Sequence, residues 1–162
     1  MTLQQQLVTG GLFVATAESL TAGLLGSELV SAPGASSFFL GGIISYQDEI
    51  KIHQLGVGPN LMAQSTAVSS EVAIQMAIGA RERFARDCSK NIDQVIGIST
   101  TGVAGPDPVG NHPVGQVFIG IASRRGQGAL SLRLHGTRDQ IRTASVKAAL
   151  SALTDEIHLL LG

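Results

Sequence analysis

The chain is poor in cysteine and in aromatic residues. It contains one cysteine, Cys88, one tyrosine and no tryptophan among 162 residues. A single cysteine cannot form a disulfide within the chain, which favours a reducing compartment. Because aromatic residues make up only 4%, small aliphatic side chains have to build the core. The 20 glycines indicate tight turns and close approaches of one backbone to another.

Charged residues are also few, and the two signs nearly balance. Eleven Lys and Arg residues against 12 Asp and Glu residues give a formal net charge of -1. The basic excess that nucleic-acid binding requires is therefore missing. No uncharged apolar stretch approaches the roughly 18 residues of a membrane span, and no basic N-terminus leads into an apolar run as in a signal peptide. We expect a cytoplasmic protein that binds neither nucleic acid nor membrane.

Several common ligand sites have no counterpart in the sequence. No Gly-Lys pair followed by Ser or Thr forms a Walker A loop, and no G-x-G-x-x-G follows a predicted strand. The four histidines are scattered without metal-ligand spacing. The sequence therefore predicts a protein that uses neither a metal nor an organic cofactor.

The periodicity of apolar residues predicts one α/β domain that spans residues 1–162. The expected order of elements is α-β-α-β-α-α-β-β-β-α, with a mixed sheet flanked by helices in three layers. A buried strand is expected at 11–17, a second strand at 38–46 and a strand that runs into a Gly-rich turn at 93–106, with a hairpin at 114–123 and 129–136. Helices are expected at 1–9, 20–30 and 47–55, after Ser69, and from Arg138, where an apolar stripe comprises Val146, Leu150, Leu153, Ile157 and Leu160.

Hydroxyl groups stand where the first strand gives way to a helix, in the stretch TAESLTAG at residues 16–23. Position alone favours Ser19 as a helix cap that accepts a hydrogen bond from a backbone N–H of the first turn. The same junction would also expose Ser19 in the crevice at the carboxyl end of a strand. Sheets of α/β proteins bind ligands there, and a helix N-terminus favours anions.

Two further stretches each allow a structural and a chemical interpretation. In SYQDEIK, the only tyrosine, Tyr46, precedes Lys51 by five residues. They are either a half-buried aromatic residue and a solvated lysine, or a base with a hydroxyl that relays its proton. The stretch STTGVAGPDPVG, at 99–110, is either a Gly/Pro turn or a row of backbone N–H groups that binds an oxyanion.

Taken together and in this order, the stretches resemble the CinA C-terminal domain family, whose characterised enzymes are nicotinamide-nucleotide amidases of the PncC type. The family pattern A-E-S-C-T-G-G corresponds to AESLTAG, and the following P-G-S-S, Gly-rich strand and Tyr correspond to PGASSFFLGGIISY. LGV, TAVS, TGVAGP, PVG and GTRDQIR continue the match into the last helix. The resemblance covers nearly the whole chain, which resembles the stand-alone form of the family.

The resemblance implies an amidase that converts nicotinamide mononucleotide (NMN) to nicotinate mononucleotide and ammonia in pyridine nucleotide recycling. Ser19 would be the nucleophile, Lys51 the general base, and Tyr46 a proton relay or orienting group. Thr101 and Gly102 would help to form the oxyanion and substrate pocket. Arg138 and Arg142 are candidates for the phosphate of the substrate, with a solvated helix face as their alternative. The residues implied to bind substrate are Thr21, Gly23, Gly42, Thr101, Gly102, Arg138 and Arg142.

The chain departs from the family pattern at several positions. Leu20 replaces a usual Cys, Ala22 replaces a usual Gly, Thr66 stands where Gly is common, and the loop GPDPVGNHP differs from the typical G-P-x-G-G. The changes at Leu20 and Ala22 leave a second function open. The Ala22 methyl group is expected to affect substrate affinity more than reaction type, because the backbone there approaches the ligand. The alternatives are a non-catalytic nucleotide-binding or regulatory (competence/damage-related) module, and an amidase for another small molecule. The resemblance also implies a homodimer.

Overall fold

Five strands form a single mixed sheet in a computed structural model that describes residues 1–162. The strand order is β2-β1-β3-β4-β5. Strand β1 (Phe13–Glu18) lies parallel to both β2 (Phe39–Ile44) and β3 (Val95–Gly102). Strands β3, β4 (Gln116–Ser123) and β5 (Gly126–Arg133) pair antiparallel. The predicted α/β fold with a mixed sheet is confirmed.

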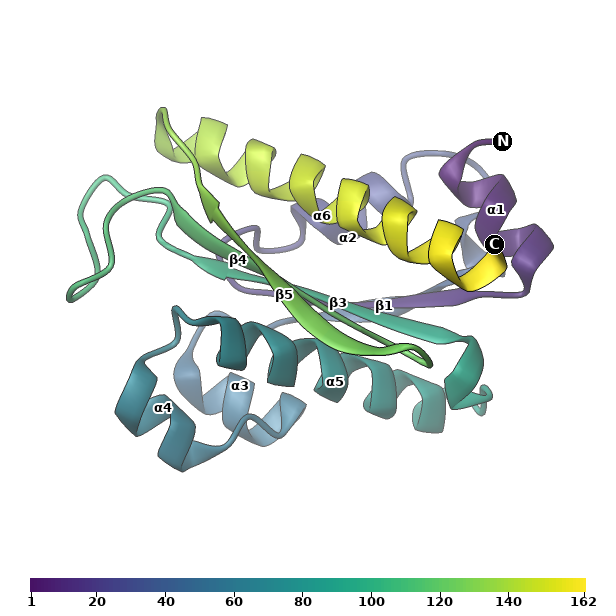
Figure 1. Ribbon diagram of the computed structural model, residues 1–162, viewed down its shortest axis with the longest axis horizontal. Helices are drawn as coiled ribbons and strands as arrows, with labels where there is room; N and C mark the ends of the chain where they lie inside the picture. Colours follow the sequence, from purple (N-terminus) through teal and green to yellow (C-terminus); the bar gives the residue numbers. More distant parts are fainter.

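Helices cover both faces of the sheet and produce three layers (Figure 1). One face carries α1 (Leu3–Gly10), α2 (Leu24–Leu29) and α6 (Arg138–Leu161). The opposite face carries α3 (Asp48–Leu55), α4 (Pro59–Ser65) and α5 (Ser70–Asp87). None of these helices combines the length and the apolar character needed to cross a membrane. Two short 3-10 helices complete the chain, at Ala35–Ser37 and Ile92–Gln94.

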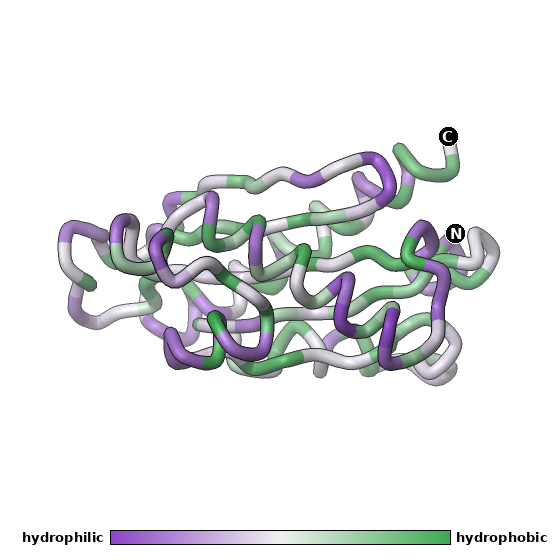
Figure 2. The backbone as a smooth tube through the Cα atoms, turned by 90° about the horizontal axis from the view of Figure 1, so that it is seen from below, coloured by the Kyte–Doolittle hydropathy of each residue, from purple (hydrophilic) through white to green (hydrophobic).

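Each face of the sheet has its own hydrophobic core. The larger cluster of 20 buried residues joins the sheet to α1, α2 and α6, and the second cluster of 10 lies under α5 and its neighbours. Four of the five residues in the predicted α6 stripe are buried, and Leu150 packs against them. Figure 2 shows hydrophobic stretches running through the strands and into the last turn of the chain. The α6 stripe therefore belongs to the core.

Helix α5 lies unusually close to the sheet because glycines face it. Ser69 caps the helix as predicted, by accepting a hydrogen bond from Val72 N–H at 3.2 Å. A Cβ atom on Gly97 would collide with the Ala77 carbonyl oxygen, and one on Gly120 with the Ala73 carbonyl oxygen. The small residues Ala73 and Ala77 of α5 and these glycines thus complement each other.

The predicted start of one helix and the predicted start of one strand are wrong, and the structure contains one helix more than expected. The helix expected at 20–30 begins only at Leu24, because the five preceding residues form a turn. Strand β5 begins three residues earlier than expected, because a two-residue turn lets Gly126 pair with Ser123. Helix α4 was not predicted; it begins at Pro59, whose fixed φ suits the first position of a helix.

Replacing Gly120 tests the close contact between α5 and the sheet. Gly120→Ala should lower the free energy of unfolding by about 1–3 kcal/mol, because the new methyl group has to push against helix backbone. Gly128→Ala, in the neighbouring strand, is the matched control, since a Cβ there meets nothing within 4 Å. Urea unfolding of both variants measures the difference, and equal stabilities would contradict the proposed packing constraint.

Candidate active site

Residues 19–23, here called the Ser19 turn, follow the carboxyl end of β1 beside the carboxyl end of β3. Ser19 N–H donates to the Thr100 carbonyl oxygen at 3.0 Å, so it extends the pairing of the two strands. The chain then turns, and Ala22 N–H donates to the Ser19 carbonyl oxygen at 3.1 Å. Helix α2 begins after Gly23, and none of its N–H groups donates a hydrogen bond to the Ser19 hydroxyl. The helix-cap interpretation of Ser19 is therefore wrong.

The carboxylate of Glu18, rather than Ser19, caps helix α2. It is 2% exposed and accepts hydrogen bonds from the N–H groups of Gly23, Leu25 and Gly26 at 2.8–3.0 Å. It also accepts one from the Thr21 hydroxyl at 2.7 Å. A buried carboxylate at a helix N-terminus is stabilised by such charge-assisted bonds and by the helix dipole. Glu18 thus fixes the chain immediately after Ser19.

A pocket opens beside Ser19 at this end of the sheet. Its walls come from the ends of β1 and β3, from α3, from the segment before α5, from the loop after β3 and from the first residue of α6. Six residues that the sequence analysis assigned to the site line it together. They are Ser19, Tyr46, Lys51, Thr101, Gly102 and Arg138.

Lys51 is the most unusual group in the pocket, because its side chain is only 1% exposed. Its ammonium donates a hydrogen bond to the Tyr46 carbonyl oxygen at 3.1 Å and lies 3.7 Å from Asp48 Oδ1. Burial lowers the pKa of Lys51 below its usual range, and the Asp48 carboxylate opposes that shift. A lysine whose pKa is lowered by burial gives up its proton more readily than an exposed one.

Tyr46 contacts the site through two different groups. Its carbonyl oxygen orients Lys51, whereas its half-exposed side chain places the hydroxyl 3.4 Å from Arg138 Nη2. Arg138 also donates to the Gly105 carbonyl oxygen at 2.6 Å. The Tyr46 hydroxyl and Arg138 thus form one side of the pocket mouth, next to the loop after β3.

Thr101 and Gly102 form the wall of the pocket at the end of β3. The Thr101 hydroxyl is already engaged, since it donates to the Ala67 carbonyl oxygen at 2.6 Å. Gly102 is required by packing, because a Cβ atom there would lie 2.6 Å from the Gln116 carbonyl oxygen. Both residues therefore shape the pocket, while the hydroxyl of Thr101 holds the neighbouring wall in place.

Four of the implied substrate-binding residues lie outside the pocket lining. Thr21 is fully buried and bonds to Glu18 and to the Thr100 hydroxyl. Gly23 ends the Ser19 turn in a left-handed conformation, with φ of 97°. Gly42 lies against Thr16 inside the sheet. The fourth is Arg142, whose guanidinium binds backbone carbonyl groups of the Ser19 turn.

Two groups of the site were not predicted from the sequence. Asp48 lines the pocket and pairs with Lys51, and the i, i+3 spacing of the two residues on a helix was the available signal. The backbone N–H of Leu20 donates no hydrogen bond within the chain, although Leu20 also lines the pocket. A free N–H beside a hydroxyl group is a ready donor to a ligand oxygen. No residue pattern in the sequence indicates that the Leu20 N–H is free.

The amino-acid sequence matches one protein family along nearly its whole length. The family model for the CinA C-terminal domain covers residues 1–157. The chain belongs to the CinA C-terminal domain family. It is 45% identical over 144 residues to a CinA-like protein of Frankia casuarinae, covering 89% of this chain and 31% of that protein. With a protein of Desulforamulus reducens named as competence-damage inducible, it shares 40% identity over 146 residues, 90% of this chain and 34% of that protein.

Solved structures of the CinA superfamily share the fold. The competence/damage inducible protein CihA from Agrobacterium tumefaciens has a TM-score of 0.83 and 32% identity, covering 94% of this chain and 92% of that one. A CinA superfamily protein from Escherichia coli has a TM-score of 0.85 and 28% identity, covering 99% and 86%. This CinA-family domain spans about a third of the length of the curated relatives it matches.

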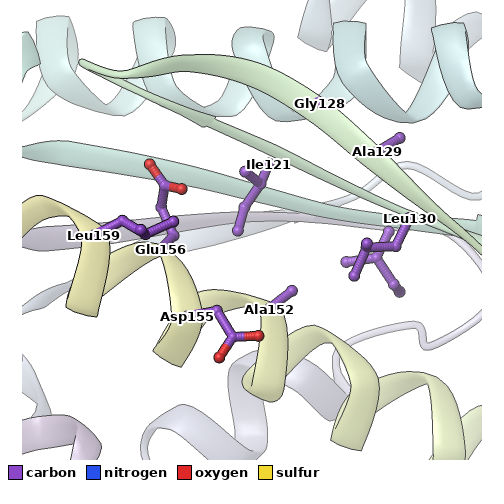
Figure 3. Close-up of a pocket in the computed structure, with 9 residues that line it drawn as sticks. Ile121, Gly128, Ala129, Leu130, Ala152, Asp155, Glu156 and Leu159 are labelled. Atoms are coloured by element: carbon purple, nitrogen blue, oxygen red, sulfur yellow. The ribbon is translucent and has the colours of Figure 1, made fainter.

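A second hollow lies at the far edge of the sheet, between β4, β5 and α6 (Figure 3). Its lining is mostly apolar, with Ile121, Leu130 and Leu159 among its side chains. Glu156 is the buried acid there, and it is bonded to the Ser123 hydroxyl and to Arg125 Nη1. Ser123 does not line this hollow, whereas Ser19 and Lys51 both line the other pocket, so the Ser19 pocket is the candidate active site of the domain.

The departure from the family pattern at Ala22 affects backbone conformation rather than the pocket. Ala22 is exposed, does not line the pocket and adopts φ of 47°. The expectation that its methyl group lies near a ligand is therefore wrong. Left-handed backbone costs a residue with a Cβ atom about 1–2 kcal/mol, so the usual glycine would relieve strain in the Ser19 turn.

Restoring glycine at this position should stabilise the protein. Ala22→Gly is expected to raise the free energy of unfolding by roughly 0.5–1 kcal/mol, because relief of strain exceeds the entropy cost of glycine. Ala63→Gly, at an exposed position within α4, is the control and should lower it by about 1 kcal/mol. Thermal or urea unfolding measures both, and a loss of stability in Ala22→Gly would contradict the strain.

Proposed function

We propose that the protein is an amidase that hydrolyses the carboxamide of NMN to give nicotinate mononucleotide and ammonia. The observation that best supports this is that Ser19 and Lys51 line one pocket, and that Lys51 is buried with a lowered pKa. A serine and a lysine whose pKa is lowered by burial are the components of a nucleophile and its base. We infer NMN as the substrate from the resemblance of the sequence motifs to those of nicotinamide-nucleotide amidases.

In the first step, Ser19 Oγ attacks the carboxamide carbon of the substrate. The hydroxyl proton passes to the neutral amine of Lys51, and the carbonyl oxygen becomes an oxyanion. The Lys51 ammonium then gives its proton to the amide nitrogen, the C–N bond breaks, and ammonia leaves. The burial of Lys51 favours the neutral amine that accepts the first proton.

In the second step, water attacks the acyl group bound to Ser19. Lys51 takes a proton from the water and returns one to Ser19 Oγ as the ester bond breaks, which releases the carboxylate product. The free Leu20 N–H is the donor in the best position to stabilise the oxyanion of both steps, because it belongs to the residue after the nucleophile.

Arg138 is the residue that we assign to the phosphate of NMN. It lies at the pocket mouth in the first turn of α6, and its partners there are neutral, the Gly105 carbonyl oxygen and the Tyr46 hydroxyl. An arginine whose charge is not neutralised can bind a phosphate group through two N–H donors. The carboxylates of Asp48 and Asp107 also line the pocket, so its total charge does not by itself attract an anion.

Ammonia release from NMN tests the proposed reaction. The purified protein should produce ammonia and nicotinate mononucleotide in equal amounts, and Ser19→Ala should lower kcat by roughly 10³-fold or more. Ser27→Ala, at an exposed position in α2, is the matched control and should keep the wild-type rate. Near-normal turnover by Ser19→Ala would exclude Ser19 as the nucleophile. NMN binding without any ammonia would instead favour a non-catalytic nucleotide-binding module.

The pH dependence tests Lys51 as the base. Activity should rise with pH as Lys51 loses its proton, because only the neutral amine accepts the Ser19 proton. Asp48→Asn removes the charge that favours the protonated lysine and therefore lowers the pKa of Lys51 further. The acidic limb of the kcat/KM profile should then shift to lower pH.

A carboxylate outside the pocket provides the control for this shift. Asp155→Asn lies in the apolar hollow at the far edge of the sheet and should leave the profile unchanged. A profile of Asp48→Asn that coincides with the wild type, or moves to higher pH, would show that Lys51 is not the titrating base.

A further inference from the structure

Arg142 reaches from helix α6 to the backbone of the Ser19 turn. Its Nε donates to the Leu20 carbonyl oxygen at 2.9 Å, and its Nη2 donates to the Thr21 carbonyl oxygen at 3.3 Å. Its Nη1 lies 3.7 Å from the exposed carboxylate of Asp139. Each nitrogen of the guanidinium therefore has a partner in the chain, and none of them lines the pocket.

The two carbonyl groups that Arg142 binds belong to the two residues that follow Ser19. In a trans peptide, the carbonyl group and the next N–H point in opposite directions, so a bond that holds one also sets the direction of the other. The planar fork of arginine can hold two adjacent carbonyl groups at once, whereas a lysine offers a single centre of charge. Arg142 therefore constrains the orientation of successive peptide planes in this turn.

Arg142 and Glu18 hold the Ser19 turn from different elements. Glu18, at the end of β1, binds the hydroxyl of Thr21 and N–H groups at the start of α2. Arg142 binds the carbonyl groups of the same turn from α6. Arg142 thus fixes the peptide units on both sides of Thr21. The unit between Ser19 and Leu20, which carries the Leu20 N–H, is held by the bond from Ala22 N–H to the Ser19 carbonyl oxygen, so its direction depends on the turn that Arg142 and Glu18 maintain.

We propose that Arg142 is a positioning residue that maintains the reactive geometry of Ser19 and of the Leu20 N–H, and that it is not a ligand of the substrate phosphate. This inference rests on the proposed function only for the substrate, because the reactivity of Ser19 can be measured without NMN. It assigns the two arginines of the α6 start to different tasks. Arg138 lies in the pocket lining, and Arg142 acts through the Ser19 turn.

The reactivity of Ser19 towards a fluorophosphonate probe is the direct test. In this reaction Ser19 Oγ forms a bond to phosphorus, the P–F bond breaks, fluoride leaves, and the hydroxyl proton passes to Lys51. Arg142→Gln should lower the labelling rate constant by about tenfold or more, since small displacements of a nucleophile cost about two orders of magnitude in rate. Arg142→Lys, which can replace one of the two bonds, should fall between Arg142→Gln and the wild type.

Arg124 provides a matched control for the loss of an arginine that binds backbone. It donates to the Leu160 carbonyl oxygen at 2.9 Å, at the opposite end of α6. Arg124→Gln should therefore lower thermal stability in the same way as Arg142→Gln while labelling of Ser19 stays within about twofold of the wild type. Mass spectrometry of the intact protein, with Ser19→Ala as background, measures the label.

Steady-state kinetics separates positioning from phosphate binding. With NMN, Arg142→Gln should lower kcat by about 10- to 100-fold and change KM little. The same loss of kcat/KM is expected with nicotinamide riboside, which lacks the phosphate. A phosphate ligand would instead raise KM for NMN and leave the riboside unaffected, which is the behaviour expected of Arg138→Gln.

Each outcome distinguishes this inference from the proposed function. Wild-type labelling rates in Arg142→Gln, or a loss confined to KM for NMN, would overturn the inference. A wild-type Ser19 that does not react with the probe would overturn it too, because no reactive geometry would then exist. If the wild type labels rapidly and Arg142→Gln slowly while NMN yields no ammonia, the proposed function fails and the positioning role of Arg142 stands.

Discussion

The hydrogen bonds of one buried carboxylate determine where the polypeptide goes after the first strand. Glu18 accepts four bonds from groups within the next eight residues, so β1, the turn and α2 are joined at a single point. An unpaired carboxylate would be costly to bury there, and these donors remove that cost. Because the position of Ser19 follows from this arrangement, the pocket depends on a residue that does not line it.

The buried lysine shows how the fold accommodates a group that the core would normally exclude. Lys51 lies on α3, directly after the end of β2, and only a carbonyl oxygen and one half-exposed carboxylate are near its ammonium. Neither partner is a fully buried negative charge, so the lowering of the Lys51 pKa by burial is only partly opposed. The absence of a strong, buried ion pair is what makes this lysine a candidate for the base of the proposed reaction.

Most of the architecture followed from the periodicity of the sequence, and the pocket followed from its motifs. Ser19, Lys51 and Thr101 come from separate stretches, and the structure brings them into one lining. What the sequence did not predict depends on tertiary contacts. The turn at 19–23 replaces a helix start because the Glu18 carboxylate binds the Thr21 hydroxyl and the Gly23 N–H. Arg142 turns from the pocket to the backbone because α6 passes beside that turn. Neither contact has a local spacing that would indicate it.

The two termini lie together at one end of the molecule, and the loop after β3 lies at the other (Figure 1). Since that loop and the first turn of α6 form part of the pocket, substrate would enter from the side opposite the chain ends. A polypeptide fused at either terminus would therefore leave the entrance open. With this geometry, the domain can be joined to other polypeptides without blocking its pocket. This suits a family in which a matching region forms about a third of much longer proteins.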